Sequence, residues 1–219
     1  PELPVWQVIT ESSNLGTARI AKMIGPEKQR EFLSSLGFTT PTSVEMIEAS
    51  GGKPLLPKRW NELETMTISY GHGLSATPLH LATGYAALAN GGRLVKPTLL
   101  ERKKFDLGPQ VISKEVAENS LAMLRGVVTE GTASLADVNG YFVAGKTGTA
   151  DKPSAQGGYD KEKNITNFAS IFPTHEPKYV LVVTLDEAQD TSGPEPKRTA
   201  GWTAVPVSAE IIARVAPLL

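Results

Sequence analysis

Apolar positions recur at helical spacing through most of residues 1–92. A short apolar helix is predicted over residues 4–10, and the polar run at 11–14 ends it, because short polar side chains compete with the backbone for hydrogen bonds. Further helices are predicted from apolar stripes bounded by Gly or Pro: Leu15 to Ile24, a segment around Phe32 to Leu36, and a buried helix that begins at Thr77-Pro78. Residues 39–69, rich in Pro and Gly, are predicted to be irregular.

A short strand interrupted by Pro97 is predicted over residues 94–100, and Ser113 is predicted to cap a helix after it. The apolar side chains expected on the inner side of that helix are Val116, Leu121, Leu124, Val127 and Val128.

The last third of the chain has short apolar runs typical of strands, at residues 141–150, 164–172 and 179–186. The third run is almost continuously apolar, which favours a central strand or one covered on both faces. The polar residues 151–163 are predicted to form a long, mobile loop. With a terminal helix around residues 207–215, this order of elements predicts an α+β fold.

The composition changes this picture little, but it excludes several kinds of site. There are 22 basic and 23 acidic residues, so the near-neutral charge argues against nucleic acid as the main partner. The absence of cysteine excludes a disulfide, a thiolate nucleophile and a cysteine metal site. The three histidines are far apart in sequence, so no metal site and no cofactor are expected.

The tetrad Lys146-Thr147-Gly148-Thr149 lies at the end of the strand predicted over residues 141–150, after the apolar run 141–144. A cation and two hydroxyls can hold a carboxylate, and a glycine lets a second backbone lie flat against the strand edge. The tetrad therefore predicts a receptor for a peptide that ends in a carboxylate.

The segment Ser12-Ser13-Asn14 is the only S-x-N sequence in the chain and lies 134 positions before the tetrad. S-x-N and K-T-G belong to one motif set with a nucleophilic S-x-x-K. One S-x-x-K occurs, at residues 50–53, but Gly51-Gly52 and a following Lys-Pro pair are poor helix formers. A nucleophilic serine and its lysine must share the first turn of a helix, so residues 50–53 are not expected to supply the nucleophile.

With these motifs, the chain resembles the transpeptidase domain of class B penicillin-binding proteins, most closely the division (septal) type. The resemblance rests on four stretches: residues 12–18, 70–79, 85–92 and 143–150. It implies a serine β-lactamase/DD-transpeptidase-like fold, with a helical lobe and an antiparallel sheet covered by helices, incomplete at its N-terminal side. Residues 1–219 would be the C-terminal portion of one such domain, with a helical part at 1–92 and a sheet part at 93–219.

The resemblance also implies a reaction, in which a serine acyl-enzyme forms on peptidoglycan stem peptides. Ser12 would relay a proton, and Asn14 would hold the substrate amide and orient the S-x-x-K lysine. Lys146 would supply positive potential. Thr147 and Thr149 would bind the substrate carboxylate through their hydroxyls. The Thr149 backbone N–H would form half of an oxyanion hole. Gly148 would let the donor peptide add to the sheet as a strand. The alternative for Ser12 and Asn14 is a helix cap.

The partners that the resemblance implies are a stem peptide ending in D-Ala-D-Ala, β-lactam antibiotics, divisome proteins and a missing N-terminal segment that carries S-x-x-K. The domain would face the periplasm from the bacterial inner membrane. The 219-residue chain alone is predicted not to form a covalent penicilloyl adduct.

Two alternatives stay open: a non-catalytic relative that binds β-lactams or peptides, and a class A β-lactamase. A β-lactamase needs a deacylating glutamate between the two motifs, and the residues with a suitable position are Glu45, Glu48, Glu62 and Glu64. The chain departs from the family where Asp151-Lys152 follows the tetrad, which leaves open whether Lys152 assists the anion. His72 is not expected to be catalytic.

Overall fold

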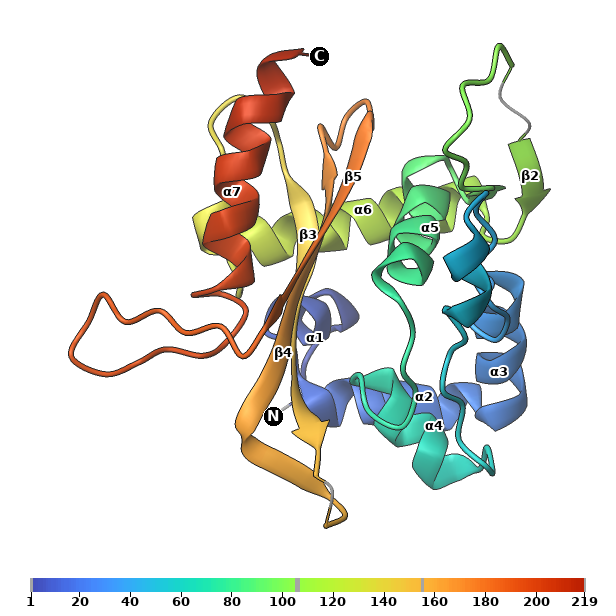
Figure 1. Ribbon diagram of the computed structural model, residues 1–219, viewed down its shortest axis with the longest axis vertical. Coiled ribbons are helices and arrows are strands. Elements are labelled where there is room, and N and C mark those ends of the chain that lie inside the picture. Colours follow the sequence, from blue (N-terminus) through green and yellow to red (C-terminus); the bar gives the residue numbers. More distant parts are fainter. Residues whose placement is uncertain (1, 105–106, 155, 219) are drawn as a thin grey trace. The chain divides into compact units, whose positions relative to one another are not determined.

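The computed structural model describes residues 2–104, 107–154 and 156–218, and the chain divides into two compact units, residues 1–121 and 122–219 (Figure 1). Helix α6 (Lys114–Thr129) runs across the division. Within the described ranges, every helix is too short or too polar to cross a membrane.

The first unit is mainly helical, and its elements are α1 (Val5–Thr10), α2 (Asn14–Ile24), α3 (Pro26–Ser35), η1 (Ile47–Gly51), α4 (Glu62–Ser69) and α5 (Pro78–Ala89). The helices predicted from apolar stripes are confirmed. The start of α5 is a capping box: the Thr77 hydroxyl accepts from the His80 N–H at 3.3 Å, and the Thr77 N–H donates to His80 Nδ1 at 3.2 Å. Pro78 occupies the first turn, where a missing N–H costs nothing.

The prediction that residues 39–69 are irregular is wrong for α4. Asn61 begins this helix, because its side chain accepts hydrogen bonds from the N–H groups of Leu63 and Glu64 at 2.8 and 3.4 Å. The helix packs against α2 and has eight residues, too few to establish a clear apolar stripe.

A two-stranded antiparallel sheet follows α5, with strands β1 (Arg93–Val95) and β2 (Leu107–Gln110). Strand β1 ends before Pro97, earlier than predicted, since proline has no N–H for the ladder. The Ser113 hydroxyl caps α6 by accepting from the Val116 N–H at 3.2 Å, as predicted. The inner side of α6 is confirmed at Val127 and Val128, which are fully buried, whereas Val116 is 52% exposed and was wrongly placed there.

The second unit is built on an antiparallel sheet in the order β3-β4-β5, with bounds Ala144–Pro153, Tyr159–Phe172 and Tyr179–Asp186. Helix α7 (Ala204–Val215) packs against β4, β5 and the short helix η2 (Ser134–Ala136) (Figure 1). The core contains fully or nearly fully buried side chains from β4 and α7: Phe168, Ile171, Phe172, Val205 and Ile212. The predicted α+β meander with a covering helix is confirmed.

Two strand predictions are wrong in this unit. The supposed loop at residues 151–163 is largely a hairpin, in which Lys152 pairs with Asp160 and Pro153 with Tyr159 beyond a bulge after Asp151. The sequence of this hairpin is polar because its residues are half-buried or exposed. Strand β5, predicted to be central or covered on both faces, is an outer strand of the described sheet, and Val183 is its one buried residue. Strand β4 is central and carries most of the buried residues.

Candidate active site

The Ser12-Ser13-Asn14 segment forms the sharp turn between α1 and α2. Ser12 has a positive φ of 56°, which is uncommon for a residue with a Cβ. Ser13, and neither Ser12 nor Asn14, caps α2: its hydroxyl accepts from the Gly16 N–H at 3.2 Å. Ser12 and Asn14 are exposed, and the N-cap of α2 is the residue between them, Ser13.

Strand β3 places the tetrad on an outer strand of the sheet. Arg125 of α6 holds the start of this strand: its guanidinium donates to the Val143 carbonyl at 2.8 Å and forms an ion pair with Asp137 at 2.8 Å. Gly145 is required by packing, because a Cβ there would lie 2.5 Å from the Ala169 carbonyl oxygen and 2.7 Å from the Phe168 ring. Together these contacts fix the strand just before Lys146.

Side chains along β3 alternate between the two faces of the sheet. Thr147 and Thr149 pair with Phe168 and Thr166 of β4, and all four side chains share one face. On that face the Thr166 hydroxyl accepts from the Thr203 hydroxyl just before α7, at 3.0 Å. Lys146 starts from the opposite face, but its ammonium reaches back to the Thr147 carbonyl at 3.0 Å. The ammonium therefore lies near the Thr147 hydroxyl, at 3.4 Å, and the two threonine side chains lie on one face of β3.

Gly148 is not explained by the fold itself. A Cβ at this position would meet only the Asn167 Cβ, at 3.9 Å, which is ordinary contact. The residue is exposed and lies on an outer strand. A glycine there leaves room for another backbone to approach the strand, and the addition of a donor peptide at this place stays a prediction.

Burial lowers the pKa of Lys146 to about 8, from an ordinary value of 10.5. The cause is desolvation, which disfavours the charged ammonium. An anion placed next to this ammonium would gain more from it than from a solvated lysine, because less water screens the interaction.

Both threonine hydroxyls of the tetrad have partners that no sequence motif indicated. Thr147 Oγ1 lies 2.6 Å from Thr132 Oγ1, and Thr149 Oγ1 accepts from the Ala200 N–H at 3.0 Å. Thr132 lies between α6 and η2, and Ala200 lies just before α7. Neither residue had a signal in the sequence, since each becomes relevant only when the chain folds back onto β3.

Lys152, which follows the tetrad on β3, is paired with two carboxylates. Its ammonium pairs with Asp186, and with Glu187 at 2.7 Å. These hydrogen bonds, first to Asp186 and then to Glu187, raise the pKa of Lys152. The ammonium charge is thus balanced by two carboxylates at the end of β5.

Several of the histidines and glutamates considered in the sequence have structural partners. His80 belongs to the α5 capping box, and its Nε2 is 2.8 Å from the Thr40 carbonyl oxygen. The His72 ring contacts the Tyr70 ring.

The Glu45 carboxylate accepts hydrogen bonds from the Leu99 N–H at 3.0 Å and the Thr98 hydroxyl at 2.7 Å, and these bonds lower the pKa of Glu45 to about 2. Glu62 pairs with Lys22 at 2.9 Å. No cluster of three potential metal ligands occurs within the described ranges.

The rejected Ser50-to-Lys53 segment does not form the start of an α-helix. The backbone makes a short 3-10 turn, η1, that ends at Gly51, and Lys53 lies outside it. This agrees with the prediction that these residues do not begin an α-helix.

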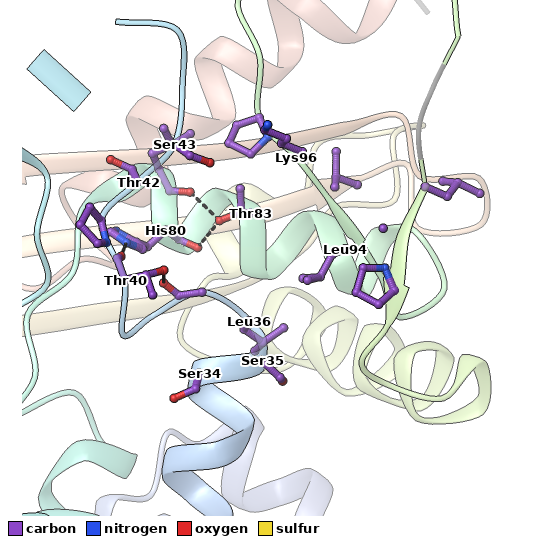
Figure 2. Close-up of a pocket in the computed structure, with 18 residues that line it drawn as sticks. Ser34, Ser35, Leu36, Thr40, Thr42, Ser43, His80, Thr83, Leu94 and Lys96 are labelled. Carbon is purple, nitrogen blue, oxygen red and sulfur yellow. Dashed lines mark hydrogen bonds between the residues drawn. The ribbon is translucent and has the colours of Figure 1, made fainter. Parts of the chain in front are cut away.

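A pocket of about 510 Å³ opens in the first unit between the end of α3, α5 and the β1–β2 sheet (Figure 2). Its polar wall includes Ser35, Thr40, Thr42, His80 and Thr83. Figure 2 shows the Thr83 hydroxyl bonded within its own helix, and it donates there to the Leu79 and His80 carbonyls at 2.9 and 2.8 Å. The described residues that line this pocket include none of the predicted site residues.

Comparison with known proteins supports a single family. Residues 2–212 match the penicillin binding protein transpeptidase domain. Over 228 residues the chain is 33% identical to a probable peptidoglycan D,D-transpeptidase FtsI of Caulobacter vibrioides, a match that covers 99% of this chain and 38% of that protein. The chain therefore spans well under half the length of this curated relative.

Solved structures agree with this result. The apo transpeptidase domain of Burkholderia pseudomallei penicillin-binding protein 3 is 34% identical, with a TM-score of 0.86, over 99% of this chain and 65% of that chain. Penicillin-binding protein 3 of Mycobacterium tuberculosis, complexed with aztreonam, is 28% identical, with a TM-score of 0.83, over 97% of this chain and 51% of that chain. The predicted transpeptidase-like fold is confirmed.

Proposed function

Because the chain belongs to the family of class B penicillin-binding protein transpeptidase domains, we propose that its parent protein is a serine D,D-transpeptidase of septal wall synthesis. It would cross-link peptidoglycan stem peptides. The serine Oγ bonds to the carbonyl carbon of the penultimate D-Ala, the amide bond breaks, and the terminal D-Ala leaves with a proton. An amine of a second stem peptide then displaces the serine oxygen.

One observation carries this proposal. The desolvated Lys146 ammonium and two hydrogen-bonded hydroxyls, those of Thr147 and Thr149, lie on an outer strand. The same strand carries Gly148, a glycine that the packing of the fold does not require. This arrangement suits a peptide that adds to the strand edge and ends in a carboxylate. β-Lactams carry an anionic group in the corresponding position, a carboxylate in penicillins and a sulfonate in aztreonam, with which the Mycobacterium tuberculosis relative is complexed.

Within this proposal, Ser12 relays a proton to the leaving amine, Asn14 holds the substrate amide, and the Thr149 N–H contributes to an oxyanion hole. These roles, and the meeting of the Ser12–Asn14 turn with Lys146 at one substrate, are predictions. The nucleophilic serine is proposed to lie on an S-x-x-K segment outside the 219 residues. The site would act in the periplasm, attached to the inner membrane and associated with divisome proteins.

Intact-mass spectrometry with benzylpenicillin tests the proposal. We expect the full-length protein to gain the mass of one penicillin, and the 219-residue chain to gain none, because a stable acyl-enzyme needs the nucleophile. Absence of an adduct on full-length protein would favour a non-catalytic relative. An adduct that forms and is rapidly hydrolysed would favour a β-lactamase.

The pKa of Lys146 predicts how acylation depends on pH. The ammonium is present below a pKa of about 8 and is lost as the pH rises through that value. We therefore expect the second-order rate constant for acylation to fall above pH 8. Lys146→Arg should retain its charge and move this decline above pH 10. A rate constant that stays flat to pH 10 in the wild type, with folding verified by circular dichroism, would contradict the assignment.

A further inference from the structure

Thr132 lies in the turn after α6 and faces the tetrad across a short hydrogen bond. Its Oγ1 is 2.6 Å from Thr147 Oγ1, and either oxygen could be the donor from distance alone. Thr132 is exposed and Thr147 is half-buried, so this pair lies at the margin of the strand rather than in the core.

The surroundings of Thr147 are compatible with Thr132 as the donor in this pair. The Lys146 ammonium, which can only donate, lies 3.4 Å from Thr147 Oγ1. If Thr132 also donates to this oxygen, both Thr147 lone pairs are used, and the Thr147 proton is the one hydrogen-bonding group that remains. A carboxylate accepts only, so this arrangement prepares the Thr147 hydroxyl to bind one.

Thr149 shows the same arrangement through a different partner. Its Oγ1 accepts from the Ala200 N–H at 3.0 Å, a group that can only donate. The Thr149 proton is thereby left for another acceptor. The Thr149 hydroxyl is thus held as an acceptor, and the Thr147 hydroxyl is held in the same way when Thr132 is the donor.

The turn that carries Thr132 is held rigidly. The Ala133 N–H donates to the Val127 carbonyl at 3.1 Å, and Ala133 is fully buried. On the other side, a Cβ at Gly201 would lie 2.9 Å from the Thr132 carbonyl oxygen, so the segment before α7 passes close to the turn. A rigid turn can fix the direction of a hydroxyl at little entropic cost.

We propose that Thr132 is a positioning residue for carboxylate recognition: it donates to Thr147 and so directs the Thr147 proton toward the terminal carboxylate of the substrate or of a β-lactam. This assignment rests on the proposed transpeptidase function. Thr132 itself does not touch the ligand.

The test compares Thr132→Val, which keeps the shape but has no hydroxyl, with Thr132→Ser, which keeps it. In the full-length protein, Thr132→Val should weaken the initial complex with benzylpenicillin about tenfold, the size of one neutral hydrogen bond, and leave the acylation step almost unchanged. Thr132→Ser should remain within about twofold of wild type. With benzylpenicillin methyl ester, which has no carboxylate, Thr132→Val should match wild type.

The outcomes separate this assignment from the proposed function. A wild-type protein that forms no adduct would end both. A reactive wild type with an equally reactive Thr132→Val would end the Thr132 assignment alone. Equal losses with the acid and the ester, unrestored by serine, would show that Thr132 only supports the local structure, which also overturns the assignment.

Discussion

Replacing Lys146 with methionine in the full-length protein is expected to lower the second-order rate constant for acylation by benzylpenicillin about 1,000-fold, or about 4 kcal/mol in transition-state stabilisation. Methionine preserves an unbranched apolar stem and removes the ammonium. Because burial already deprives Lys146 of water, little solvent is positioned to replace its charge. The rate constant is measured from the time course of a fluorescent penicillin adduct.

Lys152→Met is the matched control, since Lys152 lies six residues along the same strand. Its ammonium is paired with Asp186 and Glu187, so its removal should change the rate constant by no more than about threefold. Similar losses in both variants would show that the strand responds to any lost cation, and the role given to Lys146 would be wrong.

A double-mutant cycle extends this measurement to the S-x-N turn. If Ser12 and Lys146 act on one substrate, the combined Ser12→Ala and Lys146→Met variant should lose much less than the product of the two single losses. Strictly multiplicative losses would argue that the two motifs act independently.

The largest expected effect on stability is that of Gly92→Ala. Gly92 has a φ of 88°, and a Cβ there would lie 1.8 Å from the Ile112 carbonyl oxygen. To remove this overlap the backbone must move, and the movement breaks the hydrogen bonds from the Val111 and Ile112 N–H groups to the Gly92 carbonyl, which are 2.9 and 3.1 Å long. We expect the free energy of unfolding to fall by about 3 kcal/mol or more, measured by urea denaturation with tryptophan fluorescence.

Gly91→Ala separates backbone strain from steric overlap. Gly91 also has a positive φ, of 61°, but its nearest neighbour would be the Lys114 Cγ at 3.8 Å. This variant should lose only the cost of a left-handed alanine, about 1 kcal/mol. Equal losses at the two positions would mean that the predicted overlap with Ile112 is absorbed by small adjustments.

Much of the fold could be predicted because its signals are local. A cap is made by side chains that reach only two or three residues along the chain, so Thr77-Pro78 and Ser113 marked their helices correctly. The strand that carries the tetrad could also be predicted from a local signal, the apolar run directly before it. Val143 and Ala144 of this run are fully buried. Where the local signal was short, as in α4, the prediction was wrong.

The amino-acid sequence by itself determined which residues carry charge and hydroxyl groups, where most helices begin, and which glycine lies in the tetrad. The tertiary structure decided that β5 is an outer strand, that Lys152 is taken by Asp186 and Glu187, and that Thr132 and Ala200 hold the two threonine hydroxyls. It also decided the desolvation of Lys146. The reason is the distance along the sequence over which each interaction acts. Helix caps and apolar periodicity depend on residues a few positions apart. Strand order, the choice of ion-pair partner and burial depend on segments that meet only in the folded chain, such as the hydroxyl partners 15 and 51 residues away.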